Sequence, residues 1–377
     1  MAANHEIKGE RGAMSILKKV IAVFPMAALS LGMLLVAPSA TAASMACMGI
    51  NFGSAIPGER FTTPKRLAGQ TRYGTAQKIV DEAFPQTSQY VVVASGEYFP
   101  DALASTGLAG ALDAPLVLTN GNELSPETRT ELQRLHPQTI VIVGGKYVVT
   151  DAVAAQIAQV TGLSPKRIAG ENRYDTSYQV YVQGKALGAR WYRNGVLVAT
   201  GESFADALSA SSYAYEMNVP IFLSNPQTGL SPDMVTVMKE DHIYATTIVG
   251  GSSVVPSDLI KAQTAAIPYS CSVIVAGANR YETSWQMASR SYYNAGTSVT
   301  FATGNSFPDA LAGGVLAGVK KGPILLVENE RSSTLKWLSE ESRRGRVPDE
   351  VFILGGEKAI SRSTANAIAD AAAMTHS

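Results

Sequence analysis

Three aspartates in this sequence stand in one shared motif, Phe-x-Asp-Ala-Leu, which ends a predicted strand and opens a predicted helix. They are Asp101, Asp206 and Asp309. A carboxylate in that position can bind a metal ion or act as an acid or base, but such sites need a second acid nearby. The position four residues earlier is acidic in only two of the three motifs. Because an aspartate also suits the positive end of a helix dipole, we interpret the three as structural capping residues and predict no metal site.

A second motif, Arg-Tyr-x-Thr, supplies cationic and aromatic side chains. Its residues are Arg72, Tyr73, Arg173, Tyr174, Arg280 and Tyr281. Threonine or asparagine precedes each arginine, which is typical of a helix N-cap. Two interpretations of this motif stay open. Either each arginine pairs with an aspartate of its own or a neighbouring copy while the tyrosine packs beside it, or the guanidinium fork binds an anionic group of a ligand.

A pair of adjacent glycines forms the third motif. The pairs are Gly144 and Gly145, Gly250 and Gly251, and Gly355 and Gly356. Glycine pairs occur in phosphate-binding turns, but the dinucleotide fingerprint Gly-x-Gly-x-x-Gly is absent after every predicted strand. The sequence therefore argues against a nicotinamide or flavin enzyme. We predict no nucleotide cofactor and a structural role for the glycines.

The three motifs recur in the same order and at nearly constant distances. Successive arginines are 101 and 107 residues apart, the aspartates 105 and 103, and the first glycines of the pairs 106 and 105. Such spacing predicts three tandem copies of one module. We place the copies at residues 65–164, 165–270 and 271–377.

Each copy has the pattern of a small α/β module. Short apolar runs such as residues 90–94 alternate with helical segments, which is typical of a parallel sheet covered on both faces. Right-handed crossovers then make each module Rossmann-like. The helix predicted to begin near each aspartate is rich in alanine, glycine and serine, so it can closely approach either its own sheet or the equivalent helices of the other copies. We hypothesise that the three modules meet through them as a pseudo-threefold trimer.

The N-terminus reads as an export signal. Two lysines precede an apolar stretch over residues 20–36, and the small residues Ala-Thr-Ala follow shortly after it. We predict a signal peptide at residues 1–42, with Met14 as an alternative start, and a leader at residues 43–64. A membrane anchor fits less well because the stretch is short for a span and contains a proline. A lipidated Cys47 fits less well because no aliphatic residue stands three positions before it.

The charge balance and the few cysteines and histidines argue against several classes of function. The chain has 31 basic and 31 acidic residues, whereas a nucleic-acid-binding protein usually has a strong basic excess, so we expect no nucleic-acid partner. Export permits a disulfide between Cys47 and Cys271, but the sequence does not show that they meet. The four histidines lack metal-ligand spacing and no Gly-x-Ser-x-Gly motif occurs. We therefore expect no cofactor and no catalytic machinery.

Together with a Pro-Ile-Leu-Leu segment, these motifs resemble the cell-wall-binding repeat 2 family from about Lys65 to the C-terminus. The resemblance implies Rossmann-like modules in a pseudo-trimer that hold surface proteins of Gram-positive bacteria non-covalently to an anionic wall polymer. It also implies polymer binding by the Pro-Ile-Leu-Leu motif. That motif is intact only at Pro323, Ile324, Leu325 and Leu326. The corresponding segments that begin at Pro115 and Pro220 carry conservative changes.

We therefore predict a secreted, non-catalytic, wall-associated protein that binds an anionic wall polymer through the Arg-Tyr-x-Thr residues and residues 323–326. Two alternatives stay open: a wall hydrolase or amidase modifier that uses the three aspartates, and an adhesin or surface-layer component. Family members often display an additional enzymatic domain. Residues 43–64 are too short for one, so none is expected here, and the oligomeric state is not predicted.

Overall fold

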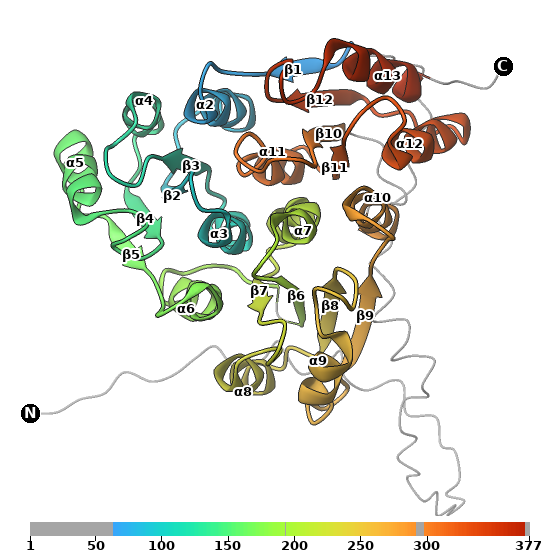
Figure 1. The fold of residues 1–377 in the computed structure, drawn as a ribbon. Coiled ribbons are helices and arrows are strands. Elements are labelled where there is room, and N and C mark those ends of the chain that lie inside the picture. The colour runs from blue at the N-terminus through green and yellow to red at the C-terminus, as the bar shows by residue number, and fades with distance from the viewer. Residues whose placement is uncertain (1–62, 193, 292–297, 374–377) are drawn as a thin grey trace, which may run out of the picture. The chain divides into compact units, whose positions relative to one another are not determined.

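The computed structural model describes residues 63–192, 194–291 and 298–373, which form three parallel four-stranded sheets connected by helices (Figure 1). The strand orders are β3-β2-β4-β5, β7-β6-β8-β9 and β1-β12-β10-β11. Every strand pair within these sheets is parallel. The predicted α/β class and the three parallel sheets are confirmed.

The strands of the first sheet are β2 (Tyr90–Ser95), β3 (Leu116–Thr119), β4 (Thr139–Val143) and β5 (Lys166–Ile168). Those of the second sheet are β6 (Gly195–Thr200), β7 (Ile221–Ser224), β8 (Ala245–Val249) and β9 (Cys271–Val275). Those of the third sheet are β1 (Lys65–Leu67), β10 (Ser298–Thr303), β11 (Ile324–Val327) and β12 (Glu350–Leu354).

Helices connect the strands in all three parts of the chain. The first six are α2 (Arg72–Ala83), α3 (Phe99–Ala111), α4 (Pro126–Leu135), α5 (Asp151–Thr161), α6 (Arg173–Ala186) and α7 (Phe204–Glu216). The others are α8 (Pro232–Glu240), α9 (Ser257–Thr264), α10 (Arg280–Ser291), α11 (Gly313–Val319), α12 (Ser333–Arg343) and α13 (Arg362–Ala373).

The sheets are offset by one strand from the repeated copies of the sequence. The strand that opens each copy pairs with the last strand of the preceding copy: β5 with β4, and β9 with β8. The opening strand β1 pairs with β12 of the last copy (Figure 1). At each junction the first glycine of the pair donates its N–H to the carbonyl of the last residue in the opening strand. Gly144, for example, donates to Ile168 at 2.9 Å. Each sheet therefore combines residues from two copies.

Local physical chemistry accounts for the elements. Helix α2 buries Ala76, Ile79 and Val80 along one stripe, as the helical spacing of these residues predicts. The strands β3, β7 and β11 are buried along their whole length, as expected of strands covered on both faces. The N-caps also form: the side chain of Thr71 accepts the N–H of Gly74.

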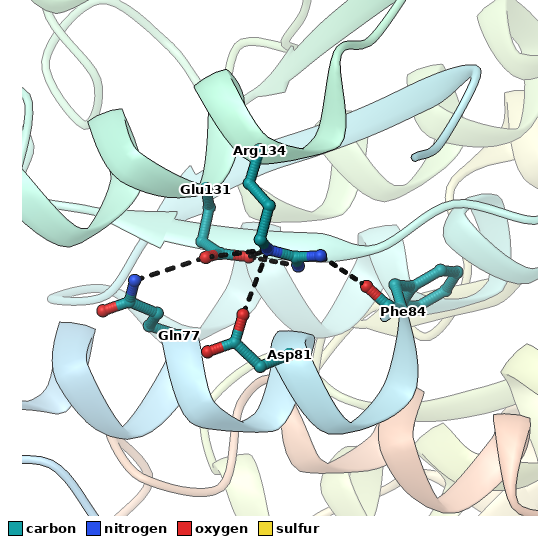
Figure 2. Close-up of polar contacts among 5 residues, drawn as sticks. All are labelled: Gln77, Asp81, Phe84, Glu131 and Arg134. Atoms are coloured by element: carbon teal, nitrogen blue, oxygen red, sulfur yellow. Dashed lines mark hydrogen bonds and ion pairs between the residues drawn. The ribbon is translucent and has the colours of Figure 1, made fainter. Parts of the chain in front are cut away.

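A polar cluster joins helix α4 to helix α2 (Figure 2). Arg134 forms ion pairs with Glu131 at 2.6 Å and with Asp81 at 3.1 Å, and donates to the carbonyl of Phe84 at 2.8 Å. Gln77 donates to the buried Glu131 carboxylate at 3.3 Å. Burial, and then the charge of Glu131, raise the pKa of Asp81. The cluster supplies hydrogen-bond partners to the buried Glu131 carboxylate. None of its residues belongs to the three repeated motifs.

Helices α3, α7 and α11 pack against one another through small residues, as predicted. A Cβ atom added at Gly107 would lie 2.2 Å from the carbonyl oxygen of Val219, and one at Gly110 would lie 2.0 Å from that of Tyr215. The backbones are therefore too close for any side chain at these two positions. The pseudo-threefold arrangement of the modules stays a prediction.

The third of these helices starts later than predicted. The sequence predicts a helix from about Asp309, but α11 begins at Gly313, so the prediction was wrong for this copy. The N–H groups of Ala310 and Gly313 donate to carbonyls three residues earlier, at 2.9 and 2.8 Å, which is turn geometry. Gly313 and Gly314 lie inside α11, so their low helix propensity does not account for the turn at residues 309–312.

The predicted signal peptide at residues 1–42 and all but the last two residues of the predicted leader at residues 43–64 lie outside the described part of the chain. Cys47 also lies outside it, so whether Cys47 pairs with Cys271 stays open. Within the described part, no helix is both long enough and apolar enough to cross a membrane.

Candidate functional site

The three Phe-x-Asp motifs converge through their phenylalanines. The rings of Phe99, Phe204 and Phe307 lie 5.6 to 6.2 Å apart, centroid to centroid, in edge-on and tilted contacts. Such aromatic pairs contribute about 0.5–1.5 kcal/mol beyond their buried area. The motif segments of all three copies therefore meet in one place.

Around this aromatic cluster, residues of successive copies form three contacts that we call seams. The first seam consists of Asp101 and Gly144 of the first copy and Arg173 of the second, and the second seam of Asp206, Gly250 and Arg280. The third seam consists of Asp309 and Gly355 of the last copy and Leu67 of the first.

The aspartates of the first two seams are buried against the glycine pairs. Asp101 is 7 % exposed and Asp206 8 %. A Cβ atom on Gly144 would lie 2.8 Å from the Oδ2 atom of Asp101, and one on Gly250 would lie 2.7 Å from that of Asp206. Both glycines also have positive φ angles, +125° and +121°, which residues with side chains rarely adopt. The predicted structural role of these glycines therefore has a steric and a backbone cause.

The surroundings of the two buried aspartates favour the neutral acid. Burial raises the pKa of Asp101 to about 6, against the opposing charge of Arg173. Burial likewise raises the pKa of Asp206 to about 6, against the charge of Arg280. In both cases the arginine belongs to the following copy. Of the two interpretations of the arginines, pairing with a neighbouring copy therefore has an electrostatic basis at two seams.

Each motif arginine also holds the backbone of its own copy. The Nη1 atoms of Arg72, Arg173 and Arg280 donate to the carbonyl oxygens of Gly96, Gly201 and Gly304, respectively. These distances are 2.8, 2.5 and 2.5 Å. One Nη1 bond uses only part of the five-donor guanidinium fork. The guanidinium of Arg280 additionally lies 5.4 Å from the ring centroid of Phe204, within cation–π range.

The motif tyrosines pack where the arginines bond. The Cε1 atoms of Tyr73, Tyr174 and Tyr281 would lie 2.8, 2.6 and 2.4 Å from a Cβ added at the same three glycines. The Tyr174 hydroxyl donates a hydrogen bond to the carboxylate of Glu202. Burial, together with this hydrogen bond, raises the pKa of Tyr174 to about 12. The tyrosines thus pack against the strand ends, as one of the two interpretations expects.

The Pro-Ile-Leu-Leu segment lies in the core. Ile324, Leu325 and Leu326 are each 0 % exposed, and Pro323 is buried. Strand β11, which begins at Ile324, pairs with β10. In this conformation these side chains present no surface to a polymer, so their direct binding role stays a prediction without geometric support.

The first seam opens into a cavity of about 240 Å³. Among its lining residues are Tyr98, Asp101, Tyr147, Glu171, Asn172 and Arg173. Repetition does not mark the two tyrosines Tyr98 and Tyr147, because neither recurs in the other copies. The available signal was an aromatic residue at positions where the other copies have serine or lysine.

No cluster of three or more histidine, cysteine, aspartate or glutamate side chains that could hold a metal ion occurs within the described residues. Neither buried aspartate has another carboxylate among the charges that shift its pKa. Paired carboxylates are the usual machinery of glycoside hydrolysis.

Comparisons with known proteins show the family of the chain. The family described as cell wall binding domain 2 matches residues 66–154, 167–260 and 274–365. The N-acetylmuramoyl-L-alanine amidase LytC of Bacillus subtilis (strain 168) is 32 % identical over 305 residues, which cover 80 % of this chain and 57 % of the relative. The amidase enhancer of the same organism is 25 % identical over 315 residues, covering 84 % of this chain and 41 % of the relative.

Solved structures show the same fold. Cwp6 from Clostridium difficile superposes with a TM-score of 0.73 at 27 % identity and covers 82 % of this chain and 48 % of its own. Cwp8 from the same organism gives a TM-score of 0.72 at 24 % identity and covers 83 % and 52 %. The chain thus spans about half the length of the relatives it matches.

Proposed function

We propose that this chain, which belongs to the cell wall binding domain 2 family, is a secreted, non-catalytic protein that anchors to the cell wall by binding an anionic wall polymer. The family places it at the cell wall. Export and the anionic nature of the polymer are parts of the proposal.

The observation that carries the proposal is the placement of the three motif arginines. Each begins a helix (α2, α6 or α10), where the helix dipole adds a partial positive charge. Each is half-buried and bonded to the backbone through one nitrogen. The guanidiniums are therefore held in place, with donors left over for phosphate or carboxylate groups.

The aspartates support a binding role rather than a catalytic one. Asp101 and Asp206 are buried against glycine backbone, and a neighbouring arginine is the one charge that shifts the pKa of each. A hydrolase that used them would need a second group to activate water or the leaving group. The two curated relatives named as an amidase and an amidase enhancer match this chain over 57 % and 41 % of their lengths, so we do not transfer their activities.

Sedimentation of the purified protein with Gram-positive cell walls, before and after removal of their anionic polymers, tests the proposal directly. We expect co-sedimentation with intact walls and its loss after stripping. Equal binding to stripped walls would assign the ligand to peptidoglycan instead. Absence of binding to both would contradict the anchoring function.

Charge-matched variants test the role of the arginines. The triple variant Arg72→Gln, Arg173→Gln, Arg280→Gln should bind cell walls much more weakly, whereas its melting temperature should fall only slightly. The control variant changes three exposed arginines to glutamine. These are Arg129, Arg190 and Arg331. Because both triple variants remove the same net charge, a similar loss in both would indicate non-specific attraction instead of recognition at the seams.

A further inference from the structure

The first seam differs from the other two at two exposed positions. Tyr98 is 57 % exposed and Tyr147 is 100 % exposed, and both line the seam cavity. The second copy has serine at both equivalent positions, Ser203 and Ser253. In the third copy the equivalents are a serine and a lysine.

Packing does not explain Tyr147, and Tyr98 is more than half exposed. A fully exposed ring buries no apolar surface, so Tyr147 gains nothing from the core. An aromatic ring at the mouth of a cavity offers a flat apolar face, and tyrosine adds a hydroxyl for hydrogen bonding. Two such rings at one cavity are typical of a surface that receives a ring-shaped ligand with an apolar face.

The polar lining of the cavity supplies both acceptors and donors. In the part of the chain that the structure describes, no hydrogen bond reaches the buried carboxylate of Asp101, although it lines the cavity. The side-chain oxygen of Asn172 accepts the N–H groups of Tyr174 and Asp175, which leaves its NH₂ group as a donor. Arg173 adds further donors beside it.

This donor and acceptor set suits hydroxyl groups better than an anion. A phosphate group would meet Arg173, but also the carboxylates of Asp101 and Glu171. A sugar hydroxyl can donate to a carboxylate and accept from an amide or a guanidinium at the same time. The cavity, about 240 Å³, is smaller than the roughly 300–1,000 Å³ of sites for drug-sized ligands, which fits a single ring.

We propose that the first seam binds one neutral pyranose residue of the wall polymer, stacked on Tyr98 and Tyr147 and hydrogen-bonded by Asp101, Asn172 and Arg173. This inference rests on the proposed function and adds to it a division of labour. Arg72 and Arg280 bind anionic groups of the polymer, whereas Arg173 and the rest of the first seam recognise the sugar ring. The three seams are therefore not equivalent binding sites.

The first test replaces the tyrosines by the residues of the second copy. The variant Tyr98→Ser, Tyr147→Ser should bind intact cell walls about tenfold more weakly than the unmodified protein. The control is Tyr269→Ser, since Tyr269 is 74 % exposed and does not line the cavity. Unchanged wall binding by the double variant would overturn the inference, as would an equal loss in the control.

The second test uses soluble sugars and does not depend on wall binding. Saturation-transfer NMR is recorded with a panel of neutral hexoses and N-acetylhexosamines, and with inorganic phosphate as the anionic probe. We expect transfer to at least one neutral sugar, and its loss in the variant Tyr98→Ser, Tyr147→Ser. A protein that sediments with walls but transfers saturation to none of the sugars would overturn the sugar site and leave the anchoring function intact.

A third test adds two tyrosines to the second seam instead of removing them from the first. The second seam has the same buried aspartate and following arginine, in Asp206 and Arg280. The variant Ser203→Tyr, Ser253→Tyr therefore installs both rings there and should raise the number of sugars bound per chain from one to two. Sugar binding by the unmodified protein without wall sedimentation would contradict the anchoring function alone. A stoichiometry that stays at one would contradict the proposed role of the ring pair.

Discussion

The first two seams and the third seam share one sequence motif but differ in local structure. At Asp101 and Asp206 the motif opens helices α3 and α7, and the carboxylate is buried. At Asp309 the motif forms a turn, the side chain is half-buried, and α11 begins four residues later. All three aspartates nevertheless lie against the first glycine of their own pair.

This comparison distinguishes two features of the motif: the contact between aspartate and glycine, and the burial of the carboxylate. The contact between aspartate and glycine is present in all three copies, so it belongs to the architecture of the seams. Deep burial of the carboxylate is confined to the two copies whose helix starts at the motif. Identical letters in a repeat therefore do not guarantee identical protonation or identical access to a ligand.

The largest effect is expected from neutralising the two buried aspartates. Burial raises the pKa of Asp101 and Asp206 from 3.8 to about 6, so the folded protein holds these protons more tightly than the unfolded chain does. Their contribution to stability is complete below about pH 4 and is lost as the pH rises through 6, by up to about 3 kcal/mol each. The variant Asp101→Asn, Asp206→Asn should therefore be more stable than the unmodified protein at pH 7.5 and similar to it at pH 4.

Urea unfolding at the two pH values measures this difference. Asp309→Asn serves as the control, because this side chain is half-buried and should give a smaller gain at pH 7.5. An equal gain from Asp309→Asn would remove the distinction between the seams. A double variant that is less stable at pH 7.5 would show that the ionised carboxylates stabilise the fold.

A smaller effect is expected at the glycine pairs. Gly144→Ala would place a Cβ atom 2.8 Å from the Asp101 carboxylate at a φ angle of +125°, which should cost about 2 kcal/mol. The neighbouring Gly145→Ala is the control, because no heavy atom lies within 4 Å of its added Cβ. We expect Gly355→Ala to be destabilising as well, since its Cβ would lie 2.6 Å from Asp309. Thermal unfolding that ranks Gly145→Ala with the other two would contradict the steric explanation.

Much of the fold can be predicted from the sequence because buried parallel strands need continuous apolar runs and the motif spacing reveals three copies. The offset of the sheets could not be predicted. The short strand at Lys65–Leu67 has the same pattern whether it pairs within its own copy or with the last one. The late start of α11 could not be predicted either, because residues 309–312 form a turn although their Asp-Ala-Leu sequence is the same as in the two copies where it is helical.

Only part of the candidate site could be predicted from the sequence. Repetition marks residues that every copy needs, and the arginines, aspartates and glycine pairs are of that kind. Tyr98 and Tyr147 occur in one copy, and their exposure beside a cavity is a consequence of tertiary structure. The Pro-Ile-Leu-Leu segment illustrates the opposite error, since an apolar strand in the core satisfies the same pattern as a binding motif.

A still smaller effect tests whether the first two seams connect successive copies electrostatically. The charge of Arg173 lowers the pKa of Asp101, in opposition to burial. Arg173→Gln should therefore raise the pKa of Asp101 further and leave that of Asp206 unchanged, whereas Arg173→Lys, which keeps the charge, should change it least. Carboxyl ¹³C shifts followed across pH report both residues. A change of the same size at Asp206 would indicate a general rearrangement rather than a pairwise interaction.

The smallest effect is expected where the first seam differs most from the second. Because Tyr147 is fully exposed and Tyr98 more than half exposed, the variant Tyr98→Ser, Tyr147→Ser should change the free energy of unfolding by no more than about 0.5 kcal/mol. The contrasting variant is Tyr215→Ser, since Tyr215 is buried against Gly110 and Gly318 and its removal leaves a void. A large loss in the free energy of unfolding for the variant Tyr98→Ser, Tyr147→Ser would show that these tyrosines stabilise the fold. A loss confined to Tyr215→Ser would leave ligand contact as the reason for two aromatic rings on this surface.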